Sequence, residues 1–428
     1  MSNVVYLHGQ PEPIIRFLRV SEHRRLEHLL AADRLPYNRF VIEAGAFQTQ
    51  IDLVNALRKK KLELVLDTNV AELSAIARFS GQAKHSPWAN PDGILTEVHL
   101  IAGANAEIIS AIARFAVSHG FARVLSPSHF ITGTSDGWFE IDLNNCVALR
   151  RALDVEGGKS IMIDYPLIIP KNVLDDASQR RGLIKKLALV PTDGIWMRIS
   201  GFGADATAAG LRKYIADVQD FHALGKPLIA DGVGGLSALA ILAFGATCGI
   251  SHGVASKERF DASCWYKPPK ADGGGGGGNY NVLLAGIDRL LRREDAEAIV
   301  NASGGRRLVS CADRACCPLG FEDTINDPKK HFLRQRALRC DTLEVVPEPL
   351  RTKHFLDKDL TEADRRARLI AKLKLEDKKL SARLVADAIR LDRMRDVLGN
   401  LELTSRQATR SPRFPIAISK NSSKSDRS

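Results

Sequence analysis

The 428-residue chain contains no apolar run of about eighteen residues, so we expect no membrane-spanning helix. The N-terminal sequence MSNVVYLHGQPEP lacks the basic and then apolar layout of a secretory signal peptide. The 7 cysteines, an odd number spread over a long chain, do not resemble a secreted disulfide framework. These absences predict a cytoplasmic protein without a membrane partner.

What the chain does contain is a large share of apolar side chains and an excess of positive charge. Hydrophobic residues make up 45% of the sequence, enough for one large domain with an appendage. The 61 Lys and Arg residues exceed the 50 Asp and Glu residues, which gives a formal charge of +11. Because basic side chains bind phosphates, a nucleic acid (tRNA or DNA) is a plausible partner.

Short aliphatic runs alternate with helical stretches from residue 39 to residue 310. This alternation is typical of a parallel sheet connected by crossover helices. We expect eight strands, at 39–44, 62–67, 122–126, 160–164, 194–200, 226–231, 247–251 and 306–310. Eight strands in this length predict an α/β fold of the (β/α)8 TIM type, with a doubly wound open sheet as the alternative.

Changes in composition along the chain indicate where its other units begin and end. A glycine-rich loop at 268–280 interrupts the barrel, as a lid or as a tolerated insertion. A charged amphipathic helix near the end predicts packing against the barrel, a homodimer contact or a partner-protein contact. The expected units are an N-terminal helical lead-in (1–38), the barrel (39–310), a zinc-binding insertion (311–345), a helical extension (346–405) and a disordered tail (406–428).

Three cysteines and a histidine follow the last expected strand, in CADRACCPLGFEDTINDPKKH. Thiolate sulfur and imidazole nitrogen suit a tetrahedral zinc ion, and a closed set of four ligands is typical of a structural site. Buried cysteines packed beside an unrelated histidine are the alternative. The expected ligands are Cys311, Cys316, Cys317 and His331, with Cys340 and His354 in reserve.

Polar residues at the carboxyl ends of barrel strands are those that face a substrate. Four carboxylates stand at expected strand ends, and clustering them is costly unless they bind a ligand or share protons. A histidine beside them can act as an acid or base, or remain neutral and bonded to a strand carbonyl. The carboxylates are Glu43, Asp67, Asp164 and Asp231, and the other polar residues include Ser126, Ser128, Ser200, Ser251 and His252.

Three of these segments resemble tRNA-guanine transglycosylases and their relatives that modify 7-deazaguanine in DNA. EAGAFQ (43–48) is similar to the family's DSGGFQ element, and IMIDYP (161–166) is similar to its MAFDECTP element. PLIADGVGGLSALAILAFGA (227–246) resembles its GVGTPEDLVEAVARG strand and helix. The resemblance implies a barrel with a structural zinc, which exchanges or recognises guanine or a 7-deazaguanine in a nucleic acid.

The resemblance also implies roles for individual residues. Glu43 falls where the family has a catalytic aspartate, and Asp164 falls where an aspartate binds the guanine edge. A carboxylate suits that edge because it accepts from two adjacent N–H donors. Ile250 and Ser251 stand where the family has its nucleophilic aspartate, so the nucleophile is atypical or missing.

We therefore assign catalysis to Glu43, Asp231 and His252 and expect a pentosyltransferase. The substrate-binding set is Phe47, Gln48, Asp67, Asp164, Ser200, Gly201 and Gly234. Two other functions stay open. One is a non-catalytic barrel that binds a nucleic acid or a partner. The other is a flavin- or phosphate-binding oxidoreductase, because IADGVGG before an apolar helix resembles a phosphate loop.

Overall fold

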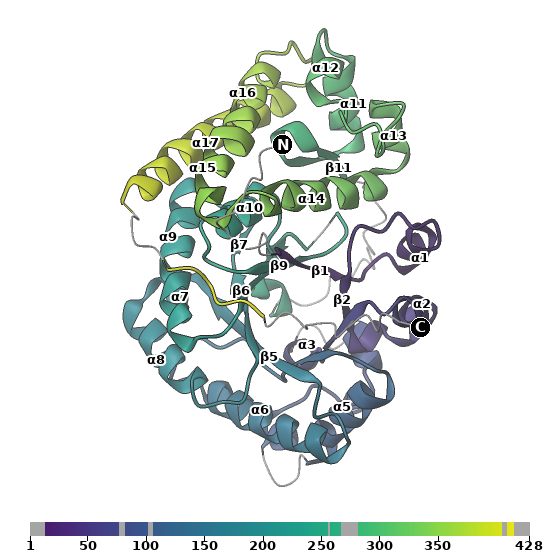
Figure 1. Ribbon diagram of the computed structural model, residues 1–428, viewed down its shortest axis with the longest axis vertical. Helices are drawn as coiled ribbons and strands as arrows, with labels where there is room; N and C mark the ends of the chain where they lie inside the picture. The colour runs from purple at the N-terminus through teal and green to yellow at the C-terminus, as the bar shows by residue number, and fades with distance from the viewer. Residues whose placement is uncertain are drawn as a thin grey trace, which may run out of the picture.

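The computed structural model describes residues 13–76, 82–101, 106–255, 257–266, 281–404 and 409–414. Eight parallel strands close into a barrel, which confirms the predicted fold class (Figure 1). The last strand pairs with the first, with Phe17 opposite Ser251. The strands are β1 (Ile15–Arg19), β2 (Arg39–Glu43), β3 (Glu63–Asp67), β4 (Arg123–Leu125), β5 (Met162–Pro170), β6 (Gly194–Ser200), β8 (Leu228–Asp231) and β9 (Gly249–His252).

The barrel's first strand lies in the segment that the sequence predicted to be a helical lead-in. β1 interrupts its apolar residues with Arg16 and Arg19, which disguised it. The predicted eighth strand at 306–310 is wrong as well, because Gly305–Val309 forms helix α12. The pairing of β1 with β9 already closes the sheet, so no strand position is left for that segment.

Helices surround the barrel, and the apolar faces of most of them pack on the strands. They are α1 (His23–Ala31), α2 (Ile51–Lys59), α3 (Val70–Leu73), α4 (Glu97–Leu100), α5 (Ala106–Ser118), α6 (Gly137–Val155), α7 (Lys171–Asp175), α8 (Ala177–Leu187), α9 (Ala208–Gln219) and α10 (Gly235–Ala243). None of the helices in the described ranges is long and apolar enough to cross a membrane.

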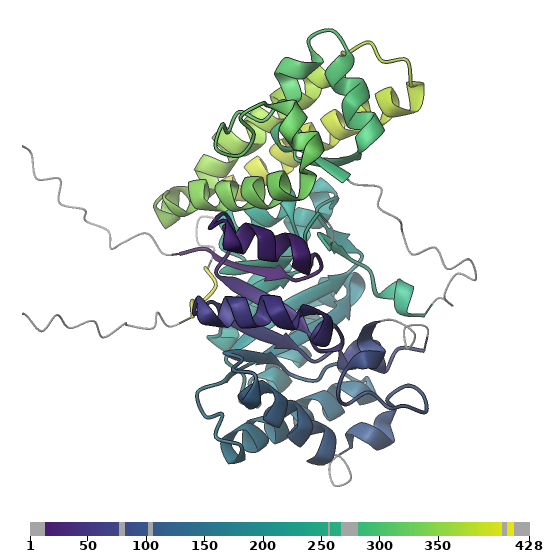
Figure 2. The ribbon, with the colours of Figure 1, turned by 90° about the vertical axis from the view of Figure 1, so that its right-hand side faces the viewer.

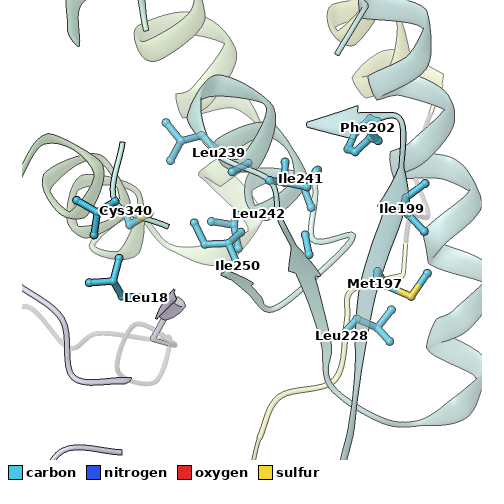
Figure 3. Packing of buried hydrophobic residues seen from close by; sticks show 14 of the residues in the cluster. Leu18, Met197, Ile199, Phe202, Leu228, Leu239, Ile241, Leu242, Ile250 and Cys340 are labelled. Atoms are coloured by element: carbon cyan, nitrogen blue, oxygen red, sulfur yellow. The ribbon is translucent and has the colours of Figure 1, made fainter. Parts of the chain in front are cut away.

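Helix α10 is buried on every side, as its all-round apolar sequence predicted. Figure 3 shows its residues Leu239 and Leu242 beside Ile250 of β9, where the helix covers the outside of the barrel. Its opposite side packs against α14 (Pro328–Glu344) of the C-terminal region. The helix therefore joins the two parts of the molecule into one core.

The C-terminal region covers one side of the barrel (Figure 2). It begins with an antiparallel hairpin of β11 (Asn281–Leu284) and β12 (Arg289–Arg292) and continues as helices, which agrees with the expected helical extension. α17 packs on α16 and on α9 of the barrel. The helices are α11 (Arg293–Asn301), α12, α13 (Phe321–Asn326), α14, α15 (Arg351–His354), a π-helical turn (Phe355–Leu360), α16 (Thr361–Ile370) and α17 (Lys378–Thr404).

The expected disordered tail is wrong for residues 409–414, which lie against the amino-terminal end of the barrel. The Ser411 N–H donates to the Gly245 carbonyl at 2.9 Å, and its hydroxyl accepts from the Leu228 N–H at 3.1 Å. The Phe414 ring lies 3.8 Å from the Arg123 guanidinium and packs on the inner core of the barrel. The rest of the tail and the glycine-rich loop at 268–280 lie outside the described residues.

Replacing Phe414 with Ala tests whether this segment stabilises the barrel. We expect the free energy of unfolding in urea to fall by about 2 kcal/mol, because the variant loses a cation–π contact and apolar packing. Leu403→Ala is the control, since Leu403 is 70% exposed and its loss leaves the core intact. Equal stability of both variants and the wild type contradicts the packing role.

Candidate functional site

Four charged side chains from four strands meet inside the carboxyl end of the barrel. Arg19 donates to both oxygens of Asp231, at 3.0 and 2.7 Å, and to Asp67 at 2.6 Å. Arg198 donates to the same two carboxylates, at 2.7 and 3.1 Å. All four are buried, and we call them the mouth network. The two positive and two negative charges compensate one another at a place where water cannot solvate them.

The mouth network forms the floor of a cavity of about 180 Å³ that opens at the strand ends. A cavity needs roughly 10–15 Å³ by this measure to hold one water molecule, so this one has room for a small ligand of several heavy atoms. Phe260 and Trp265 form an aromatic edge, with ring centroids 5.3 Å apart. The lining residues are Arg19, Glu43, Asp67, Glu72, Arg198, Asp231, Gly232, Lys257, Arg259, Phe260, Asp261 and Trp265.

The carboxyl groups of this cavity experience opposite electrostatic environments. Burial alone would raise the pKa of Asp67, but the charges of Arg19 and Arg198 outweigh it and lower that pKa to about 2. The same two arginines hold the pKa of Asp231 well below its usual range, again against burial. Burial raises the pKa of Glu72, and the charges of Glu43 and Asp67 raise it further.

Glu43, Glu72 and Asp261 are the carboxyl groups of the cavity outside the mouth network, and Asp261 accepts a hydrogen bond from the Ser263 N–H at 2.9 Å. Lys257, from the segment after β9, forms an ion pair with Glu43. Glu72 accepts a hydrogen bond at 2.7 Å from Asn69, a residue in the left-handed conformation that turns the chain from β3 into α3. The sequence singled out Glu43, but it missed Glu72 because that residue lies on a helical turn and not at a strand end.

The structure brings Glu43, Asp67 and Asp231 together, as the strand-end argument predicted. It does not bring Asp164 there. β5 continues to Pro170, so Asp164 lies near the start of its strand. Its carboxylate pairs with Arg123 at 3.0 Å and accepts from the Trp196 indole at 3.0 Å, close to Phe414. The expected contact between Asp164 and a base at the mouth is wrong.

His252 also lies outside the cavity. Its Nδ1 hydrogen-bonds the Gly253 carbonyl at 2.8 Å, and its Nε2 lies 3.2 Å from the Tyr37 hydroxyl. Burial lowers its pKa, so the imidazole is neutral near pH 7. This arrangement matches the structural alternative for His252 and gives the expected catalytic role no support.

The other expected contacts do not line the cavity. Phe47 is buried against Phe115 and His119, outside the barrel wall, and Gln48 is exposed. Ser200 accepts from the Ala262 N–H at 2.9 Å, which fixes the segment that carries the aromatic edge. Gly201 is an exposed glycine with a φ of 83°.

The protein itself fills the expected phosphate loop at the start of α10. The Glu258 carboxylate lies against Gly234 so closely that a side chain there would overlap it. Asp288 accepts from the Leu236 N–H, and Arg336 binds Glu258 at 2.7 and 2.8 Å as well as Asp288. Carboxylates therefore occupy the position in which such a loop receives an anion, and the oxidoreductase alternative gains no support.

Cys311, Cys316, Cys317 and His331 form a buried cluster beside the hairpin, and their ligand atoms lie within 4.8 Å of one another. The His331 Nδ1 is 3.6 Å from the Cys316 sulfur and 3.4 Å from the Cys317 sulfur. Its Nε2 lies 3.0 Å from the Leu283 carbonyl, to which it can donate, leaving Nδ1 free as a ligand. The cluster could bind a metal ion, and the reserve ligand Cys340 is not part of it.

The closed parallel barrel with helices around it defines the class of fold. No protein-family model and no curated protein matches the sequence. Among solved structures, KGPDC from Streptococcus mutans is similar at 14% identity and a TM-score of 0.31, over 59% of this chain and 93% of that one. A GH10 xylanase from Bispora sp. MEY-1, bound to xylobiose, is similar at 10% identity and a TM-score of 0.36, over 57% and 83%.

A type I 3-dehydroquinate dehydratase from Clostridium difficile is similar at 6% identity and a TM-score of 0.34, over 60% of this chain and 90% of that one. Likenesses this low assign no activity to the chain. None of these three proteins is a tRNA-guanine transglycosylase, so the resemblance to that family stays a prediction that rests on the sequence motifs.

The low pKa of Asp67 predicts a pH dependence of stability. Its pKa is depressed in the folded protein from 3.8 to about 2, so its stabilisation is present above pH 4 and is lost as the pH falls through 2. We expect the Asp67→Asn variant to lose this acid-dependent part, on the order of 2 kcal/mol, in urea titrations between pH 5 and pH 2. The exposed Asp92→Asn control retains it. Parallel pH profiles for all three proteins contradict the network.

Proposed function

We propose that this protein is a glycosyl-transferring enzyme of the base-exchange type, which breaks an N-glycosidic bond in a nucleic acid at the mouth of the barrel. One observation supports this proposal more than the others. Two of the carboxyl groups at the cavity have different environments: burial and the neighbouring carboxylates raise the pKa of Glu72, whereas Glu43 pairs with a lysine. Pairs of carboxyl groups in different protonation states are typical of enzymes that cleave glycosidic bonds.

In the proposed reaction, Glu43 is the nucleophile and Glu72 is the proton donor. A Glu43 oxygen attacks the anomeric carbon and forms a C–O bond, while the bond from that carbon to the leaving base breaks. Glu72 transfers its proton to the base, which leaves neutral. An incoming base then attacks the same carbon, its proton goes to Glu72, and the Glu43 carboxylate is released. Asp231 is the weaker candidate for the nucleophile because two arginines hold its oxygens.

The residues at the rim of the cavity favour a nucleic acid as the substrate. Lys257 and Arg259 have side chains that are 43% and 48% exposed, so both can contact phosphate oxygens beside the cavity. Phe260, which is partly exposed and packs against the buried Trp265, offers an aromatic ring on which a base can stack after leaving its helix. The formal charge of +11 favours the same partner. The exchange assay described below uses both tRNA and DNA, so it distinguishes an RNA substrate from a DNA substrate.

We further propose that the cysteine and histidine cluster binds structural zinc. With Zn–S bonds of 2.3 Å, tetrahedral zinc places sulfurs about 3.8 Å apart, and the Cys316 and Cys317 sulfurs lie 3.5 Å apart. Three thiolates and one imidazole complete the coordination, so this zinc would hold the loop that carries the cysteines to α14 and leave no position for a substrate.

Exchange of labelled guanine into bulk tRNA and into duplex DNA tests the enzyme. We expect the wild type to incorporate label, and Glu43→Gln and Glu72→Gln each to lower the rate at least about 100-fold, because one loses the nucleophile and the other the acid. Glu107→Gln is the matched control, an exposed carboxyl group on α5 outside the cavity.

The same experiment distinguishes the alternative of a non-catalytic barrel. Binding of either nucleic acid without exchange, and without a covalent adduct on a denaturing gel, favours that alternative. Exchange that continues at the wild-type rate in both variants contradicts the assignment of Glu43 and Glu72.

Elemental analysis of the purified protein tests the zinc. We expect about one zinc per chain, its loss in a Cys316→Ser, Cys317→Ser double variant, and a lower melting temperature, because structural zinc contributes directly to folding. Cys340→Ser is the control, since Cys340 is buried outside the cluster. Equal zinc in the double variant and the wild type contradicts the proposed ligand set.

A further inference from the structure

Beside the cavity, a serine, a histidine and an aspartate form a continuous hydrogen-bonded chain. The Ser74 Oγ lies 2.8 Å from the His129 Nε2, and the His129 Nδ1 lies 2.6 Å from the Asp142 Oδ1. The three residues come from separate parts of the barrel: the end of α3, the loop after β4, and α6. None of them lines the cavity that contains Glu43 and Glu72.

The position of the histidine ring is fixed on several sides. The second oxygen of Asp142 accepts the His129 backbone N–H at 2.7 Å, so this fully buried carboxylate binds the residue twice. The Trp138 ring stacks on the imidazole, with centroids 3.8 Å apart and planes 18° apart. The next residue, Phe130, pairs with Ile168 of β5. The Asp142 carboxylate selects the tautomer with the proton on Nδ1, which leaves Nε2 to accept the serine proton.

The serine is reachable, in contrast to its two partners. His129 and Asp142 are buried, whereas Ser74 is partly exposed. Ile76, two residues further on, is 77% exposed, so the surface of the molecule begins here. Ala75, next to Ser74, belongs to a small apolar cluster with Trp265, and Phe130 packs against this cluster. An apolar cluster therefore begins at the residue that follows the serine.

We propose that Ser74, His129 and Asp142 form a second catalytic site, in which Ser74 is a nucleophile toward carboxylic esters with an apolar acyl group. The Ser74 oxygen bonds to the ester carbonyl carbon while its proton moves to the His129 Nε2. The bond from that carbon to the alcohol oxygen then breaks, and the alcohol leaves with the proton from His129. Water releases the acyl group by the same steps, with His129 again as the base.

A fluorophosphonate probe tests this site because it phosphonylates activated serines and needs no knowledge of the natural ester. We expect wild-type protein to gain one probe per chain, located at Ser74 by peptide mass spectrometry. Ser74→Ala abolishes the labelling, and His129→Gln and Asp142→Asn each slow it at least about 100-fold, since one removes the base and the other removes the carboxylate that orients it. Ser118→Ala is the control, a serine on α5 whose hydroxyl donates to the Phe115 carbonyl at 3.1 Å.

Each variant is compared with the wild type by its melting temperature, so that loss of labelling is read only from folded protein. The hydrolysis of 4-nitrophenyl butyrate gives a second readout, in which we expect the same order of rates. Wild-type protein that is not labelled at Ser74, or labelling that proceeds at the wild-type rate in His129→Gln, overturns the proposal. Neither readout depends on base exchange at Glu43 and Glu72, so either proposed activity can fail without the other.

Discussion

The pairing of Arg19 and Arg198 with Asp67 and Asp231 is the interaction on which the architecture of the barrel mouth depends. Each arginine binds both carboxylates, so strands that are distant in sequence, β1, β3, β6 and β8, are connected at one level. Removing one member would leave a buried charge uncompensated, which typically costs about 3–5 kcal/mol. The network is therefore a rigid floor, and it also determines which carboxyl groups above it remain chemically available.

The interior of the barrel alternates between charge and apolar packing along its axis. Below the mouth network, Phe17 and Trp196 are in contact, with ring centroids 4.7 Å apart, within an apolar layer. Below that layer, Arg123 and Asp164 form a second ion pair. The α10 terminus follows the same principle: Asp288 accepts from the Leu236 amide, and Glu258 and Asp288 both pair with the buried Arg336, so these carboxylates take the place of a diffusible anion. In each of these places, buried charges are compensated by other parts of the same chain.

Much of the barrel could be predicted from the sequence, because strands such as 39–43 and 194–200 are short apolar runs that end in a polar residue. The first strand could not, because two arginines break its pattern: Arg16 points outward to Asp341 and Arg19 inward to the network. Asp164 was misplaced because the apolar run continues for several residues beyond it, and an aspartate in a long strand can lie at either end.

The candidate sites divide in the same way. Glu43, Asp67 and Asp231 are the last residues of their strands, so the rule that strand ends face the substrate found them. Glu72 and Ser74 lie on a short turn after β3, and their importance depends on neighbours contributed by distant segments. The four metal-ligand candidates are close in sequence, which is why spacing alone revealed them.

The contact of Phe414 with the base of the barrel has a consequence for how the molecule is made. β1 must pair with β9, and the end of the barrel that these strands share is covered by residues that the ribosome adds more than 150 positions after β9. Contacts between such distant segments form slowly, because a long loop must close first. During synthesis the apolar interior therefore stays accessible from below until almost the whole described chain has emerged, and this is the period in which the nascent protein is most exposed to aggregation.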